Sequence, residues 1–270
     1  MKILRSFDVL RKTINNNSNL GFVPTMGGLH KGHISLIKES KKKCKKTLVS
    51  IYVNSRQFNN KNDFSNYPRN IKKDLNLLKK LKTNYVFIPS TKEIYNIKRK
   101  KKIILSKSQK ILCAKYRKGH FEAVLDIMDR FIKLIKPRYI FMGEKDYQQL
   151  FLVKNFIKDK YKSKIYSCPT IRDKNKVALS SRNYLLSKED LNKAGLIVKI
   201  LQKAKSTIKI NNSVNAYLNT IKNNLIKKFN IKIEYLEIRN EKDLKQTFIN
   251  KKYRLFFAYY VNKVRLIDNF

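Results

Sequence analysis

Residues 20–33 read Leu20-Gly21-Phe22-Val23-Pro24-Thr25-Met26-Gly27-Gly28-Leu29-His30-Lys31-Gly32-His33. The apolar run at the start of this stretch ends at a proline, and a pair of glycines follows it. We therefore predict a buried first strand that leads into a loop. Apolar residues then recur at helical spacing over residues 33–43, which predicts a helix directly after the loop.

The same alternation of strand and helix continues along the first part of the chain. Short apolar or β-branched runs predict strands, and amphipathic segments between them predict helices. Strands that alternate with helices in this way predict a parallel sheet covered on both faces. The predicted strands cover residues 20–24, 47–53, 85–89, 139–142 and 164–168, and the predicted helices cover 33–43, 66–81, 120–135 and 148–159.

Beyond about residue 170 the pattern changes. Two helical segments, 188–207 and 214–228, come before strand-like segments at 232–238, 254–261 and 266–268. This order is typical of a small α+β domain. We therefore predict an α/β, Rossmann-like doubly wound parallel sheet over residues 1–170, followed by a second, smaller α+β C-terminal domain over residues 171–270.

The chain carries a formal net charge of +43, with dense basic runs such as residues 41–46. Such a charge favours binding to polyanions through counterion release. Lysine is spread over the whole length, however, together with many Asn and Ile residues, and no stacking platform of aromatic residues accompanies it. We interpret the charge as compositional drift and expect no specific nucleic-acid partner.

Two further features bear on the cellular setting. No stretch reaches the roughly 18 apolar residues that cross a bilayer, and the first residues lack the apolar segment of a signal peptide. Cys44, Cys113 and Cys168 are far apart and form no CxxC pair, which argues against a disulfide framework or a structural zinc site. We expect a cytoplasmic protein that binds no membrane.

The glycine and histidine segment after the first strand suggests a phosphate site. Gly27 and Gly28 let the backbone approach a ligand closely, and the helix that follows offers free N–H groups and a positive dipole end. His30 and His33 are three residues apart, so one helical turn places both rings on one side. Two alternatives stay open: a zinc site, which needs further ligands that are not nearby in sequence, and two histidines that only cap the helix.

Three other polar segments are candidates for ligand contacts. Asn54 and Gln57 follow the second strand, where amides can hold hydroxyl or carboxylate groups, although a solvated loop would look the same. The segment 143–146 reads Gly-Glu-Lys-Asp after the fourth strand. Its lysine can counter phosphate charge, and its aspartate can bind a metal or cap a helix. The segment 180–182 reads Ser-Ser-Arg and suits phosphate, with an ordinary helix cap as the alternative.

Together these four segments resemble the pantoate–β-alanine ligase family, whose members are also called pantothenate synthetases. The first segment resembles the HIGH motif that this family shares with class I aminoacyl-tRNA synthetases and nucleotidyltransferases. The Ser-Ser-Arg segment resembles the counterpart of the mobile KMSKS loop. The similarity runs in order from Val23 to the end of the chain. Among the departures, Ser55 stands where the family usually has proline, and Lys176 where it usually has glycine.

The resemblance implies an ATP-dependent condensation of pantoate and β-alanine to pantothenate through a pantoyl adenylate, with release of pyrophosphate and then AMP. It implies ATP as a substrate together with Mg2+, no metal held by the protein alone, and a homodimer. Catalytic positions implied are His30, His33, Lys145 and Arg182, with His33 mainly a hydrogen-bond donor in the transition state. Positions implied to hold pantoate and β-alanine are Gln57 and Gln149, with Asn54 and Arg117 as accessories. Positions implied to bind ATP are Met26, Gly27, Gly28, Leu29, His30, Lys31, Gly32, His33, Gly143, Glu144, Lys145, Asp146, Ile171, Leu179, Ser180, Ser181 and Arg182.

Overall fold

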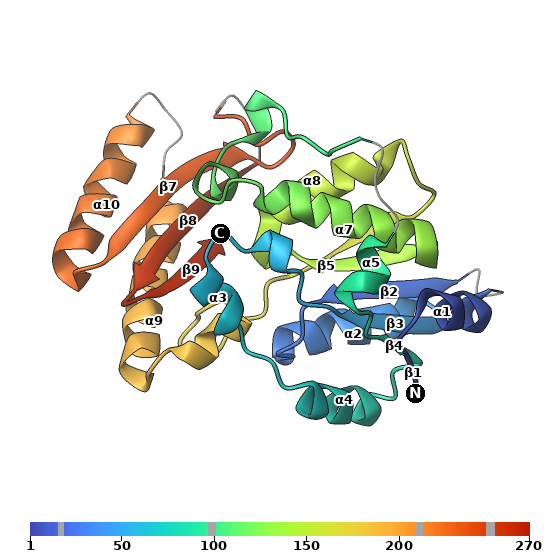
Figure 1. Ribbon diagram of the computed structural model, residues 1–270. Helices are drawn as coiled ribbons and strands as arrows, with labels where there is room; N and C mark the ends of the chain where they lie inside the picture. Colours follow the sequence, from blue (N-terminus) through green and yellow to red (C-terminus); the bar gives the residue numbers. More distant parts are fainter. Residues whose placement is uncertain (16–18, 97–100, 209–212, 247–251) are drawn as a thin grey trace. The chain divides into compact units, whose positions relative to one another are not determined.

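Six strands of the computed structural model form one sheet in which every paired neighbour runs parallel (Figure 1). The structure describes residues 1–15, 19–96, 101–208, 213–246 and 252–270. The five strands predicted for this part of the chain are all present, and a sixth strand at one edge was not predicted. Across the sheet the order is β1 (Lys2–Leu4), β4 (Tyr85–Phe87), β3 (Lys46–Ile51), β2 (Leu20–Thr25), β5 (Tyr139–Gly143) and β6 (Lys164–Cys168).

Helices connect these strands, as a parallel sheet requires. The α-helices of this region are α1 (Phe7–Ile14), α2 (Lys31–Lys43), α3 (Lys61–Ser65), α4 (Ile71–Lys80), α5 (Thr91–Tyr95), α6 (Cys113–Tyr116), α7 (His120–Ile135) and α8 (Tyr147–Lys158). Short 3₁₀ helices are η1 (Ser55–Gln57), η2 (Lys107–Gln109) and η3 (Glu144–Asp146).

The central strand β2 is buried on both faces. Phe22 and Val23 are neighbours on this strand, so their side chains point to opposite sides of the sheet. Val23 belongs to a core cluster with Ile37 of α2 and Leu78 of α4. Phe22 lies edge-on to Phe131 of α7, with ring centroids 5.6 Å apart. In Figure 1, α7 lies on one side of this sheet and α2 and α4 lie on the other. The predicted doubly wound sheet is therefore confirmed.

Two helices show how local sequence signals determine where a helix begins and ends. Helix α7 spans His120–Ile135, as the apolar spacing predicts. Helix α4 begins at Ile71 and not at the predicted residue 66, because the Asn70 side chain caps it by accepting a hydrogen bond from the Lys73 N–H at 2.9 Å.

The chain divides into two compact units, Met1–Pro169 and Thr170–Phe270. In the second unit, a three-stranded antiparallel sheet shares one apolar core with residues of two long helices. This arrangement confirms the predicted smaller α+β part. Its elements are η4 (Ser181–Leu185), α9 (Lys188–Thr207), α10 (Val214–Phe229), β7 (Lys232–Asn240), β8 (Tyr253–Val261) and β9 (Val264–Asn269). No helix in the described ranges is long and apolar enough to cross a membrane.

Gly21 allows β2 and α2 to lie close together. A Cβ atom at this position would lie 2.2 Å from the Oγ of Ser40 and 3.0 Å from the Sγ of Cys44. Ser40 is itself fixed, since its hydroxyl shares a hydrogen bond of 2.8 Å with the Thr47 hydroxyl of β3. The contact leaves no room for a larger residue.

We expect Gly21→Ala to lower the free energy of unfolding by about 1–3 kcal/mol, because the added methyl group overpacks the contact between β2 and α2. Urea denaturation followed by circular dichroism measures this change. Gly143→Ala is the matched control, since nothing lies within 4 Å of a Cβ atom built there. Equal stability of the two variants would contradict the tight contact at Gly21.

Candidate active site

Three of the predicted segments begin at the carboxyl ends of neighbouring strands. Strand β2 lies between β3 and β5, and all three run in the same direction. After β2 the chain forms β3 and β4 on one side of that strand, and then crosses to form β5 and β6 on its other side. In open α/β sheets, ligands bind outside the carboxyl ends of the strands, at the point where the strand order reverses. The segments 26–33, 54–57 and 143–149 follow β2, β3 and β5 at this edge.

The glycine pair adopts a backbone conformation that other residues rarely take. Gly27 and Gly28 have φ angles of +82° and +62°. The Gly27 N–H donates to the Thr25 Oγ1 at 3.2 Å. The N–H groups of Gly28 and Leu29 donate to the carboxylate of Asp74 at 2.9 and 2.8 Å. The N–H groups of all three residues therefore bond to acceptors within the protein.

Asp74 was not among the predicted site residues, although the sequence holds a signal for it. It lies on α4 and is only 3% exposed. It precedes Leu78 by four residues, which places a carboxylate on the helix face that the leucine buries. A buried carboxylate on an apolar stripe needs hydrogen-bond donors, and here the backbone of residues 28 and 29 supplies them.

His30 and His33 cap helix α2 reciprocally. The Gly32 N–H donates to the Nδ1 of His30 at 3.1 Å, and the His30 N–H donates to the Nδ1 of His33 at 3.3 Å. The cap that the sequence left as an alternative is therefore present. The expectation of free N–H groups at this helix start is wrong for Gly32, whose N–H is used by the cap.

The caps also fix which ring nitrogen carries the proton. Both Nδ1 atoms accept hydrogen bonds, so each neutral imidazole carries its proton on Nε2. Burial, with the positive charge of Lys145, lowers the pKa of His30 to about 4. Burial, His30 and Lys145 lower the pKa of His33 to about 3. Near pH 7 both rings are therefore neutral hydrogen-bond donors through Nε2, with ring centroids 4.1 Å apart.

Lys145 reaches this site from the end of β5. Its charge acts on both histidines. Its Nζ lies 3.5 Å from a carboxylate oxygen of Asp146, whose side chain is 47% exposed. Asp146 precedes α8 but does not cap it through its side chain. Within the ranges that the structure describes, no three His, Cys, Asp or Glu side chains are grouped so that they could hold a metal ion.

The segment after β3 is held by a network around the backbone carbonyl of Gln57. The Nδ1–H of His120 donates to this oxygen at 2.8 Å, and Arg117 donates to it at 3.1 Å. Arg117 also lies 3.0 Å from the Nε2 of His120, so that ring carries its proton on Nδ1. His120, the third histidine of the chain, was not predicted at the site, and Arg117 here contacts protein groups.

Asn54 has a donor that no residue in the described part of the chain satisfies. Its side chain is 1% exposed, and its Oδ1 accepts from the Tyr95 hydroxyl at 3.1 Å and from the Arg56 N–H at 3.3 Å. Its Nδ2 is buried without a hydrogen-bond partner among those residues. An orphaned amide donor at a strand end suits a ligand oxygen, because leaving it unpaired has a free-energy cost.

Two neighbouring glutamines on α8 differ in environment. Gln148 is buried, and its Nε2 donates to the backbone oxygen of Ile111 at 2.7 Å, so it ties α8 to the segment before α6. Gln149, the predicted substrate contact, is partly exposed. The structure therefore places Gln149, and not Gln148, where it is accessible to a small molecule.

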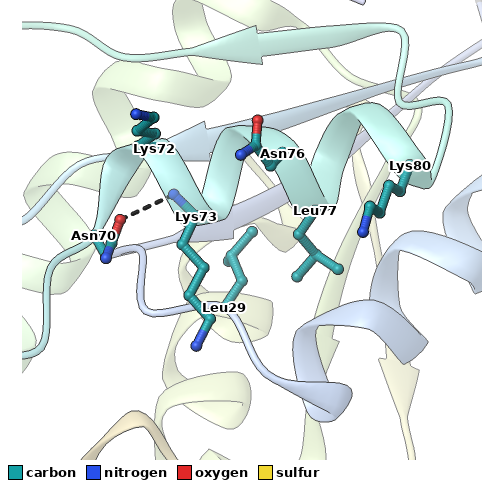
Figure 2. Close-up of a pocket in the computed structure, with 7 residues that line it drawn as sticks. All are labelled: Leu29, Asn70, Lys72, Lys73, Asn76, Leu77 and Lys80. Atoms are coloured by element: carbon teal, nitrogen blue, oxygen red, sulfur yellow. Dashed lines mark hydrogen bonds between the residues drawn. The ribbon is translucent and has the colours of Figure 1, made fainter.

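A cavity of about 440 Å³ lies along α4 (Figure 2). Leu29 is the single predicted site residue among those that line it. The others are Asn70, Lys72, Lys73, Asn76, Leu77 and Lys80. Figure 2 shows Leu29 next to Lys73 and Leu77 of α4, so the loop after β2 and this helix share one wall of the cavity.

The predicted residues from position 171 onward lie in the second unit. Ser180 caps η4 by accepting a hydrogen bond from the Arg182 N–H at 3.2 Å, and Ser181 is buried. The Leu179 N–H donates to the backbone oxygen of Ile171 at 2.9 Å, which ties the start of this segment to residue 171. The cap that the sequence left as an alternative is therefore present here as well.

A partly buried ion pair holds the residues that lead into this segment. Arg172 donates to both carboxylate oxygens of Asp268 at 2.7 and 2.8 Å, and to the backbone oxygen of Lys176 at 2.9 Å. Lys176 has a φ of +69°, a conformation that favours glycine. The lysine that departs from the family pattern therefore occupies a strained turn, which the arginine braces.

Comparisons with known proteins bear on the whole chain. A family model described as pantoate-beta-alanine ligase matches residues 2–270. A pantothenate synthetase of Francisella tularensis subsp. mediasiatica is 38% identical over 272 residues, covering 99% of this chain and 95% of the relative. One from Clostridium botulinum is 37% identical over 268 residues, covering 97% of this chain and 94% of the relative.

Solved structures give the same result. A crystal structure of pantoate-beta-alanine ligase from Francisella tularensis, complexed with beta-gamma ATP and beta-alanine, is 36% identical with a TM-score of 0.84, covering 100% of this chain and 97% of that one. The pantothenate synthetase of Thermus thermophilus is 28% identical with a TM-score of 0.90, covering 100% of this chain and 99% of that one.

We expect His30 and His33 to stay neutral, with the proton on Nε2, from pH 8 down to about pH 5. The reason is that their pKa values of about 4 and 3 lie below the ordinary 6.5. Long-range ¹H–¹⁵N NMR of the three histidines distinguishes the tautomers. His120 is the internal control, since its partners require a proton on Nδ1. Protonation of either ring near pH 6.5 would contradict the prediction.

Proposed function

The chain belongs to the pantoate–β-alanine ligase family, and we propose from this premise that its first unit, predicted as residues 1–170, binds ATP and pantoate. The chain is an AMP-forming ligase. It joins pantoate and β-alanine to pantothenate through a pantoyl adenylate, and it cleaves ATP to AMP and pyrophosphate. From the second unit, predicted as 171–270, we propose that Ser180, Ser181 and Arg182 contribute hydroxyl and guanidinium donors to phosphate binding.

The feature that supports this most is the group of His30, His33 and Lys145 at the ends of β2 and β5. In the first step, a carboxylate oxygen of pantoate attacks the α-phosphorus of ATP, and the bond to the bridging oxygen of pyrophosphate breaks. The carboxylate is already a nucleophile near pH 7, so this step needs alignment and charge stabilisation and no general base. Two neutral Nε2–H donors and one ammonium group supply both.

The amide groups supply the acceptor specificity. Asn54 presents a buried amide donor without a partner in the described part of the chain, and Gln57 follows it on η1. We propose that Gln57 and Gln149 hold pantoate, with Asn54 as an accessory. Arg117 donates a hydrogen bond to the backbone oxygen of Gln57, so we assign it a positioning role. In the second step, the amine of β-alanine attacks the acyl carbon, AMP leaves, and the amine loses a proton.

Met26 and the segment Gly143-Glu144-Lys145-Asp146 complete the proposed nucleotide contacts. Gly27 and Gly28 contribute through the shape of the loop, since their N–H groups bond within the protein.

Mg2+ is proposed to enter with the triphosphate, because this ion is usually bound through substrate phosphates and few carboxylates. The exposed carboxylate of Asp146, beside Lys145, suits such a contact. The homodimer, the cytoplasmic location and the lack of a specific nucleic-acid partner stay predictions.

We expect pyrophosphate release in a single turnover to require pantoate, and AMP release to require both pantoate and β-alanine. Gln57→Ala and Gln149→Ala should raise the KM for pantoate about tenfold or more, since each leaves a substrate oxygen unpaired. The KM for ATP should change little. Gln246→Ala, at an exposed position of the second unit, is the control. AMP release that is independent of pantoate, or an unchanged KM in both variants, would favour another nucleotidyltransferase.

We expect His33→Ala to slow pyrophosphate release by about two to three orders of magnitude, the usual loss for one transition-state donor. His33→Gln keeps an N–H donor near the position of Nε2, so it should retain more of the rate than the alanine variant. Rapid-quench kinetics of the first step measures both. Equally slow glutamine and alanine variants would contradict the role of His33 as a neutral hydrogen-bond donor.

A further inference from the structure

The loop that carries the two histidines is attached to α4 through one side chain. Asp74 accepts hydrogen bonds from the N–H groups of Gly28 and Leu29, which lie 46 and 45 residues earlier in the chain. Both of its carboxylate oxygens are used, one for each N–H. Figure 2 shows Leu29 alongside α4, in agreement with this attachment.

The carboxylate of Asp74 also packs closely against Gly27 of the loop. A Cβ atom built on Gly27 would lie 3.0 Å from the Oδ2 of Asp74 and 3.2 Å from a methyl carbon of Ile51. Gly27 also has a positive φ, so crowding and backbone conformation both disfavour a side chain there. Asp74 therefore defines one wall of the space in which the loop turns.

The position of the loop determines the position of the histidines. Leu29 immediately precedes His30, the N-cap residue of α2, and the cap links the backbone of His30 to the ring of His33. A shift of the Leu29 N–H would therefore be expected to move the Nε2 atoms of both rings. Catalytic groups need placement within a fraction of an ångström, and a shift of about 1 Å can lower a rate 100-fold.

We propose that Asp74 is a positioning residue of the ATP site, which holds the loop of residues 27–29 so that His30 and His33 present their Nε2–H groups to the phosphates. This inference rests on the proposed function of the two histidines. The residue is only 3% exposed and each of its oxygens accepts from the loop backbone, so we place its effect in the position of the loop and not in a contact with substrate. Asp74 accepts from two of the loop's three consecutive N–H groups and Thr25 accepts from the third, so side chains are left to meet the phosphates.

Asp74→Asn tests the proposal because it keeps the shape and replaces one acceptor oxygen with an NH2 group that faces a backbone N–H. We expect amide hydrogen exchange at Gly28 or Leu29, followed by NMR, to become at least about tenfold faster. We also expect the KM for ATP to rise, or the rate of pyrophosphate release to fall, by about 10- to 100-fold. The KM for β-alanine should stay within about twofold, since the amine acts in the second step.

Asp8→Asn is the matched control, because Asp8 is exposed in the first turn of α1. Faster exchange with unchanged ATP kinetics would overturn the proposal and leave Asp74 a purely structural residue. Unchanged exchange would show that the two hydrogen bonds do not hold the loop. Loss of ligase activity in the unaltered protein would instead refute the proposed function, while the exchange experiment would still report on the attachment.

A measurement on the unaltered protein covers the case in which Asp74→Asn does not fold. On saturation with a non-hydrolysable ATP analogue, we expect the amide protection of Gly28 and Leu29 and the ¹³C shift of the Asp74 carboxylate to stay the same. Their constancy would support a loop that Asp74 holds throughout binding. Loss of protection with a shift of the carboxylate signal would mean that phosphate takes these N–H groups, which overturns the proposal.

Discussion

The position of β2 between β3 and β5 is the constraint on which the site depends. Parallel pairing brings the carboxyl ends of these three strands to one edge of the sheet, and each end continues into a segment with polar side chains. The strand is buried on both faces, by Val23 against α2 and α4 and by Phe22 against α7. A slip of one residue would exchange these faces, so the packing also fixes where each segment begins.

Burial gives the two histidines their chemistry. Each ring uses one nitrogen to cap the helix and keeps the other as a donor. Burial and the neighbouring lysine disfavour the charged rings, so charge on the bound phosphates is met by hydrogen bonds and by Lys145. The cap and the proposed catalytic role are thus two uses of the same side chains, which the sequence presented as alternatives.

Apolar periodicity accounts for the parts of the fold that the sequence predicted. Strands such as β2 and helices such as α7 carry enough apolar residues to show their period. Strand β1 has three residues, which is too short for a pattern, and it forms because β4 offers it an edge. Helix α4 begins late because a capping residue decides its start, which spacing alone does not show.

At the site, too, some residues can be predicted from sequence motifs and others only from their contacts in the fold. Motif similarity predicted the residues that would touch substrates, whereas those that hold them, Asp74 and His120, depend on contacts between segments far apart in sequence. Asp74 meets backbone groups some 45 residues away, and His120 meets the Gln57 carbonyl 63 residues away. Backbone acceptors and donors leave no trace in side-chain identity, so only the three-dimensional structure shows these partners.

The seven glycines of the chain are few for its length, and several turns that favour glycine hold other residues. Lys136 and Asn230 end α7 and α10 at positive φ, and Lys176 occupies such a turn before the Ser-Ser-Arg segment. Each left-handed residue costs about 1–2 kcal/mol. A mutational bias toward lysine and asparagine can therefore replace glycine at positions where backbone strain is the only cost of the substitution. At Gly27 a side chain would meet a second penalty, because its Cβ atom would be crowded by the carboxylate of Asp74 at 3.0 Å.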